Sequence, residues 1–237
     1  MRSPVVVLEN MGQKEFFINA IELVDVHGGT NIPTVVYYRQ RNEPSVGNEA
    51  LSLARDREDL NEDFKVDLGN QKPGSLSVRR FYCADKNERS AGEITASFLQ
   101  GVVSNVSRWL EARDLKRDAN ILVAEPLAMQ DELVDENWVA NYRTNIRRIL
   151  EGKGFENVDF LPEPFAVYQY YRYGEKHPLV AERKKHHALV IDFGGGTFDV
   201  CVIATQRKVT LISVKARGWP DLCRRRRTRL AAFSSIG

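Results

Sequence analysis

Hydrophobic residues in the first part of the chain follow the pattern of short strands. The segments 4–10, 15–26 and 32–39 are rich in β-branched and aromatic residues, and short polar segments separate them. Runs of this kind that are bounded by glycine and asparagine indicate an antiparallel meander.

A four-residue hydrophobic period predicts a long helix further along the chain. Ser90 and Glu93 have the spacing of a capping box, which marks the start of this helix. Its apolar face is formed by Ile94, Phe98, Val102, Val106 and Leu110. A second amphipathic helix is expected over 135–154, stopped by Gly152 and Gly154 and buried through Val139, Tyr142, Ile146 and Ile149.

Shorter segments complete the pattern. They are a helix over 47–56, strand and loop over 61–82, a buried strand over 120–126, a strand over 158–164, a helix over 164–174, a polar linker over 174–187, and strands over 187–193, 198–204 and 209–216. This order favours a mixed α/β domain followed by the beginning of a second sheet.

Composition narrows the class of protein. With 237 residues, 43% of them hydrophobic, the chain is long enough for one large core or two modest ones. A formal net charge of +2 gives no reason to expect a polyanionic partner. The three cysteines are widely spaced, which is typical of a reducing compartment. Neither a signal peptide nor a membrane-spanning run is evident, so we expect a cytoplasmic protein without a membrane partner.

Three consecutive glycines, Gly194–Gly196, interrupt an apolar run. They do not belong to a Walker loop, because no lysine lies near them, nor to a dinucleotide fingerprint, because Asp199 stands where a glycine is needed. The residues that follow alternate like a strand, so the glycines are expected in the turn of a β-hairpin. Such a turn lets backbone N–H groups approach a phosphate. A plain tight turn capped by an aspartate is the alternative.

Asp192 and Thr197 flank the glycines and add chemistry to this turn. A carboxylate suits a hydrated Mg²⁺ ion, since magnesium prefers oxygen ligands and retains waters, and a threonine hydroxyl can donate to a phosphate.

The segment "LVIDFGGGTFDVCVI" resembles the second phosphate-binding segment of the heat-shock protein 70 ATPase domain, in the actin-like superfamily. Other segments are similar in the same order over roughly residues 3–216: "SPVVVLEN", "NIPTVVYY", "SVGNEAL", "ILVAEPLAM" and "VDFLPEPFAVYQYY". The resemblance implies an α/β fold of the actin-like ATPase (ribonuclease H-like) kind. Residues 1–185 would form lobe I without its first strand, and residues 186–216 the opening strands of lobe II.

The resemblance also implies an ATP/ADP and Mg²⁺ site. Asp192 would lie beside the metal and the attacking water, Glu163 would contact the water shell of the metal, and Lys65 would neutralise the γ-phosphate. The β- and γ-phosphates would be held by Gly194, Gly195, Gly196 and Thr197. From the residues alone, Glu163 equally fits an acid favoured at a helix N-terminus, and Lys65 a solvated surface group.

Two further matches concern coupling within the chaperone. Pro126 and Arg143 fall where the family has a proline and an arginine that couple nucleotide state to the rest of the protein. Here Glu125 precedes the proline in place of an apolar residue, which departs from the family pattern. The four histidines, His27, His177, His186 and His187, show no ligand spacing.

The first phosphate loop of the family and the remainder of its lobe II have no counterpart in this sequence. We therefore expect a fragment of a chaperone ATPase domain with weak or no Mg·ATP binding, whose polypeptide clients and co-chaperones belong to intact relatives. The alternatives are another actin-fold ATPase or sugar kinase, and a nucleic-acid binder that uses the basic tail.

The tail, residues 217–237, departs from the family. Arg224–Arg227 stand where an acidic helix start is expected. Possible codons for residues 224–230, read one base later, encode Gly-Asp-Asp-Glu-Leu-Asp, which is the expected segment. We therefore expect a single-base insertion or deletion between about Trp219 and Arg224, after which the frame is wrong.

Overall fold

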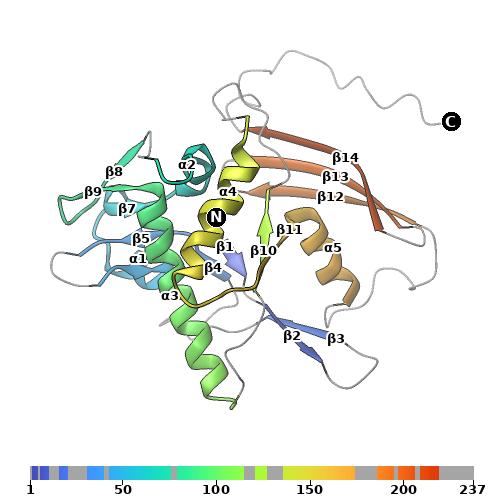
Figure 1. The fold of residues 1–237 in the computed structure, drawn as a ribbon, viewed down its shortest axis with the longest axis horizontal. Coiled ribbons are helices and arrows are strands. Elements are labelled where there is room, and N and C mark those ends of the chain that lie inside the picture. The colour runs from blue at the N-terminus through green and yellow to red at the C-terminus, as the bar shows by residue number, and fades with distance from the viewer. Residues whose placement is uncertain are drawn as a thin grey trace.

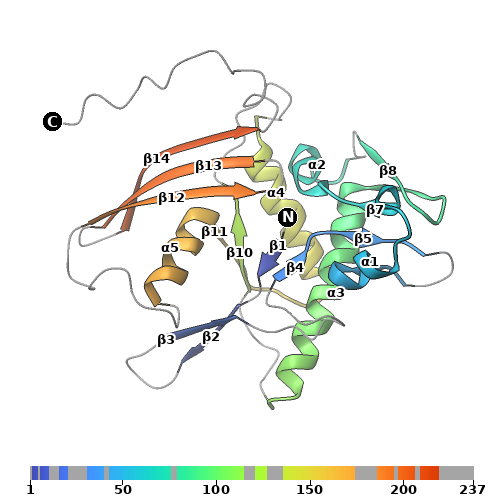
Figure 2. The same ribbon diagram turned by 180° about the vertical axis from the view of Figure 1, so that it is seen from behind.

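A computed structural model describes the backbone of residues 2–4, 6–10, 16–20, 31–39, 43–75, 79–114, 121–126, 136–173, 186–194, 197–205 and 209–218. Its helices and small sheets alternate along the chain (Figures 1 and 2). Gly195, Gly196 and residues 219–237 lie outside this set, so the arginine run and the frame change stay predictions.

The N-terminal strands form the first part of the expected meander. Strands β2 (Val6–Asn10) and β3 (Phe16–Ala20) pair as an antiparallel hairpin, whereas β4 (Asn31–Pro33) pairs with β1 (Arg2–Pro4). The prediction of one continuous strand over 32–39 is wrong, because the structure has two short strands there. The N–H of Val35 donates to the carbonyl of Pro33, and this tight turn separates β4 from β5 (Val36–Tyr37).

Strand β5 is the centre of a small antiparallel sheet. It lies between β6 (Ser45–Val46) and β7 (Leu60–Asn61), and helix α1 (Gly47–Leu53) and the 3-10 turn η1 (Arg57–Asp59) occupy the connection. The short helix expected over 47–56 is confirmed.

Helix α2 (Phe64–Asn70) corrects the expectation of strand and loop over 61–82. Among the described residues of that segment, the strands are β8 (Arg80–Tyr82), which pairs with β9 (Glu88–Ser90), and Asn61 at the end of β7. Phe64 and Leu68 are buried one turn apart on α2. A residue distant in the sequence stabilises this helix: the indole N–H of Trp138 donates to the carbonyl of Val66 at 2.8 Å.

Helix α3 (Ala91–Glu111) confirms the long helix and its start. The Ser90 hydroxyl accepts from the N–H of Glu93, and the Glu93 carboxylate accepts from the N–H of Ser90, which completes the predicted capping box. Ile94 and Phe98 on its buried face belong to the larger hydrophobic cluster described below.

A parallel pair of strands and two helices follow. Strand β10 (Ile121–Glu125) pairs with β11 (Val158–Pro162), helix α4 (Trp138–Glu151) connects them, and α5 (Glu163–Tyr173) follows β11 directly. The strand expected to be buried over 120–126 is buried on one face at most: Glu125 is buried, Ile121 and Val123 are half-buried, and Leu122 and Ala124 are exposed. The buried stripe of α4 runs through Trp138, Tyr142, Ile146 and Leu150; Val139 and Ile149 are half-buried.

The last three strands form one antiparallel sheet in the order β12–β13–β14. They span His186–Gly194, Thr197–Thr205 and Val209–Gly218, close to the expected ranges. Within the part of the chain that the structure describes, no helix is long and apolar enough to span a membrane.

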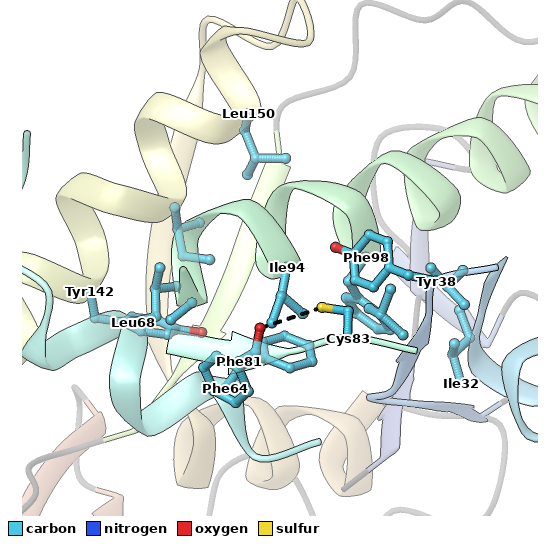
Figure 3. Close-up of a cluster of buried hydrophobic side chains, with 14 of the residues drawn as sticks. Ile32, Tyr38, Phe64, Leu68, Phe81, Cys83, Ile94, Phe98, Tyr142 and Leu150 are labelled. Atoms are coloured by element: carbon cyan, nitrogen blue, oxygen red, sulfur yellow. Dashed lines mark hydrogen bonds between the residues drawn. The ribbon is translucent and has the colours of Figure 1, made fainter. Parts of the chain in front are cut away.

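Two hydrophobic clusters stabilise these elements. In the larger one, side chains from α2, α3 and β8 converge, including Phe64, Phe81, Cys83, Ile94 and Phe98 (Figure 3). The smaller one lies between α5 and the β12–β13 sheet, where Tyr168 packs with Cys201 and Ile203. Helix α5 is thereby anchored on the sheet that carries the glycine hairpin.

The opposite face of β12 is apolar and exposed, which leads to a prediction on solubility. The side chains of Leu189 and Ile191 are 59% and 58% exposed on a strand at the edge of its sheet. Replacing both with threonine, which keeps β-propensity, should raise the concentration at which the protein stays monodisperse in light scattering. Leu51→Thr, at an exposed position on α1, is the matched control. An unchanged onset of aggregation in the double variant would contradict this.

Candidate functional site

The carboxyl ends of two parallel strands bring two glutamates to the same edge. Glu125 ends β10 and is the register partner of Pro162, which ends β11. Glu163 comes next and is the first residue of α5. Ligands of open α/β sheets bind at the carboxyl ends of parallel strands, so this edge is the candidate site.

Lys65 reaches this edge from α2. Its ammonium group donates to the carboxylate of Glu163, although 98 positions separate the two residues in the sequence. Their side chains are only 16% and 20% exposed. The structure therefore joins two of the three residues for which the sequence predicted catalytic roles.

Helix α4 fixes the position of α2 and so of Lys65. The side-chain amide of Asn145 donates to the carbonyl oxygens of Leu68 at 2.9 Å and of Gln71 at 2.7 Å. Together with the Trp138 bond to Val66, these contacts hold both ends of a helix that is too short to be stable alone. The position of Lys65 therefore depends on the contacts between α2 and α4.

A second charged pair lies at the same edge. Arg143 of α4 donates from Nε to Glu125 Oε2 at 2.6 Å, and its Nη2 donates to Oε1. The side chain of Glu125 is 2% exposed and that of Arg143 is 46% exposed. The bidentate bond raises the pKa of Arg143 and compensates the buried carboxylate. Arg143 is therefore the cationic partner of the buried Glu125 carboxylate.

Tyr142 is buried on α4 near the carboxylates of both pairs. Its ring stacks on Trp138 with centroids 5.1 Å apart and an interplanar angle of 10°. Burial first, and then the negative charges of Glu163 and Glu125, raise the pKa of the Tyr142 hydroxyl. The hydroxyl is therefore a neutral donor within the field of both carboxylates.

The glycine hairpin has the predicted strand–turn–strand form. Strands β12 and β13 are antiparallel, and their last register pair is Gly194 with Thr197. Gly195 and Gly196, which join them, and the side chains of Asp192 and Thr197 lie outside the described residues. In both views β10 and β12 end beside α4 (Figures 1 and 2). The hairpin end of the second sheet and the glutamate edge therefore face the same region.

The side chains at this edge can be compared with the ligands that the expected magnesium ion needs. Among the residues with described side chains, no group of three or more His, Cys, Asp or Glu residues could hold a metal. An ion that keeps its waters and is bound through phosphate oxygens needs no such group. One oxygen of Glu163 pairs with Lys65, and the carboxylate has further acceptor capacity for metal-bound water.

No model of a known protein family matches the chain, and no curated protein sequence matches it. Glu125 and Tyr142 were not predicted as site residues. A glutamate at the end of an apolar strand was the available signal, because a buried acid requires a cationic partner.

The Glu125–Arg143 pair leads to a prediction on stability. Arg143→Met should lower the free energy of unfolding by about 1–3 kcal/mol, because it leaves a buried carboxylate unpaired. Adding Glu125→Gln removes that charge and should recover part of the loss. Urea unfolding of Arg143→Met and of the double variant measures this. If the double variant is no more stable than Arg143→Met, the unpaired charge is not the cause.

Proposed function

We propose that this chain carries the magnesium- and phosphate-binding part of an ATP-hydrolysing site of the heat-shock protein 70 type. The contact between Lys65 and Glu163 carries the proposal. The resemblance assigns Lys65 to the phosphate and Glu163 to the metal from their separate segments of the sequence, and the structure brings the two side chains into contact.

Phosphoryl transfer to water depends mainly on positioning the reactants and neutralising the charge of the phosphates. Lys65 and Glu163 have charges suited to these two tasks. An incoming γ-phosphate would compete with Glu163 for the Lys65 ammonium group. The released carboxylate would then accept hydrogen bonds from metal-bound water. Lys65 would hold the phosphate in place and offset its charge.

The hairpin would supply the remaining contacts. Backbone N–H groups at Gly194–Gly196 would form the phosphate nest. Asp192, which the resemblance assigns to the metal, is the backbone register partner of Asp199 in this hairpin. When bound, Mg²⁺ neutralises phosphate charge.

The wider proposal is a chaperone ATPase, with polypeptide clients and co-chaperones as partners of the intact protein. Its place would be the cytoplasm, a reducing compartment, which suits the unpaired and buried Cys83 and Cys201. Binding of an unfolded polypeptide would separate this proposal from another actin-fold ATPase or a sugar kinase.

Calorimetry with Mg·ATP and with ATP plus a chelator tests the phosphate site. We expect saturable binding that is weaker than micromolar and depends on magnesium, because the residues of this edge supply only a few charge contacts to the phosphates. An absence of binding at millimolar nucleotide would contradict the proposal. Sub-micromolar affinity would contradict the expected weakness of the site.

A further inference from the structure

A groove lies between the C-terminal half of α3 and the turn that follows α4. Its volume is about 570 Å³, within the range of small-molecule sites. Gln100, Ser104 and Arg108 line it from successive turns of α3, and Lys153 and Phe155 line it from the turn. None of its lining residues belongs to the Lys65–Glu163 edge.

Two cations of this groove have only neutral partners among the described residues. The ammonium of Lys153 donates to the amide oxygen of Gln100 at 2.6 Å, and Arg108 donates to the amide oxygen of Asn105. Burial lowers the pKa of Lys153. An anion in the groove would supply the missing negative charge.

The side chains, not the backbone, are available to such a ligand. The N–H groups of Gly152, Lys153, Gly154 and Phe155 already donate to carbonyl oxygens of α4. Recognition therefore falls to the two cations and to the hydroxyl groups of Ser104 and Ser107, which also line the groove.

The spacing of the cations indicates the shape of the ligand. Lys153 is bound at Gln100, and Arg108 lies eight residues further along α3, about 12 Å along the helix axis. Arg108 turns back towards Asn105 and the Gln100 amide reaches forward to Ser104, two positions about 100° apart around the helix, so the two cationic groups are on the order of 10 Å apart, mainly across α3. Val103 and Phe155 provide apolar surface in the groove.

We propose that this groove binds a small organic dianion that carries an anionic group at each end of an apolar chain. The proposal does not depend on the nucleotide site. Suberate, an eight-carbon dicarboxylate, is the probe. Succinate is too short to reach both cations, and hexanoate has one charge.

Amide chemical shifts of the full chain, measured by ¹H–¹⁵N NMR at constant ionic strength, test the proposal. Suberate should shift the resonances of Ser104, Gly152 and Gly154 saturably, with an affinity about three- to fivefold higher than that of succinate or hexanoate. Because these residues report only on the groove, binding at the Lys65–Glu163 edge would not be mistaken for it.

Two variants identify the cations responsible. Lys153→Gln and Arg108→Gln should each weaken suberate binding about three- to fivefold, whereas Lys72→Gln, at an exposed lysine outside the groove, should not. Equal affinities for the three acids, no saturable shift, or unchanged suberate affinity in both variants would each overturn the proposal.

Discussion

Replacing Lys65 with methionine is expected to weaken Mg·ATP binding by roughly tenfold to a hundredfold, the effect of losing one charge-assisted hydrogen bond. The variant also leaves the Glu163 carboxylate without its partner, and this negative charge would repel the phosphate. Calorimetry with Mg·ATP measures the change. Because both side chains of the pair are largely buried, the fold should also lose about 1–3 kcal/mol.

Matched variants separate this effect from a general change in charge. Lys72→Met removes an exposed lysine elsewhere and should leave nucleotide affinity unchanged. Glu163→Gln should reduce the dependence on magnesium while ATP alone binds at least as well, because the repelling charge is gone. If Lys65→Met and Lys72→Met have the same affinity, Lys65 does not contact the phosphate.

Replacing Gly69 with alanine is expected to destabilise the protein by about 3 kcal/mol or more, at the upper end of overpacking effects. A Cβ atom on Gly69 would overlap the indole ring of Trp138, which is buried and hydrogen-bonded to Val66. Neither group can move without separating α2 from α4. Urea unfolding and the near-ultraviolet signal of Trp138 report the loss.

Gly92→Ala is the control for a glycine within a helix. The nearest atom to a Cβ there is the end of the flexible Gln71 side chain, at 3.3 Å. Because alanine is the better helix former, this variant should be neutral or more stable by up to about 1 kcal/mol. Equal losses at Gly69 and Gly92 would show that the α2–α4 contact does not limit stability.

Local signals explain what the sequence could predict of the fold. The capping box at Ser90 and Glu93 placed the start of α3, and the glycines after Phe193 placed the hairpin, because both signals act within a few residues. Helix α2 was missed since it has only seven residues and contains Gly69 and Asn70, which are poor helix formers. Its stability comes from Trp138 and Asn145, more than sixty positions away.

The site was predictable in part for the same reason. Lys65 and Glu163 were each identified from the resemblance of their own segments, but their contact depends on how α2 packs on α4. Glu125 and Tyr142 belong to no local sequence motif. They are identified as site residues only because the fold places Glu125 beside Arg143 and Tyr142 near Glu163.

Paramagnetic broadening by Mn·ATP tests the central claim most directly, and it suits a weak site. Mn²⁺ takes the place of Mg²⁺ on the phosphates and broadens the resonances of nearby amide groups. We predict that Mn·ATP selectively broadens the amide signals of Lys65, Glu163 and Gly194–Gly196, and that Mn²⁺ without nucleotide does not. Broadening that spares these residues, or that is the same with Mn²⁺ alone, would contradict a nucleotide phosphate site at this edge.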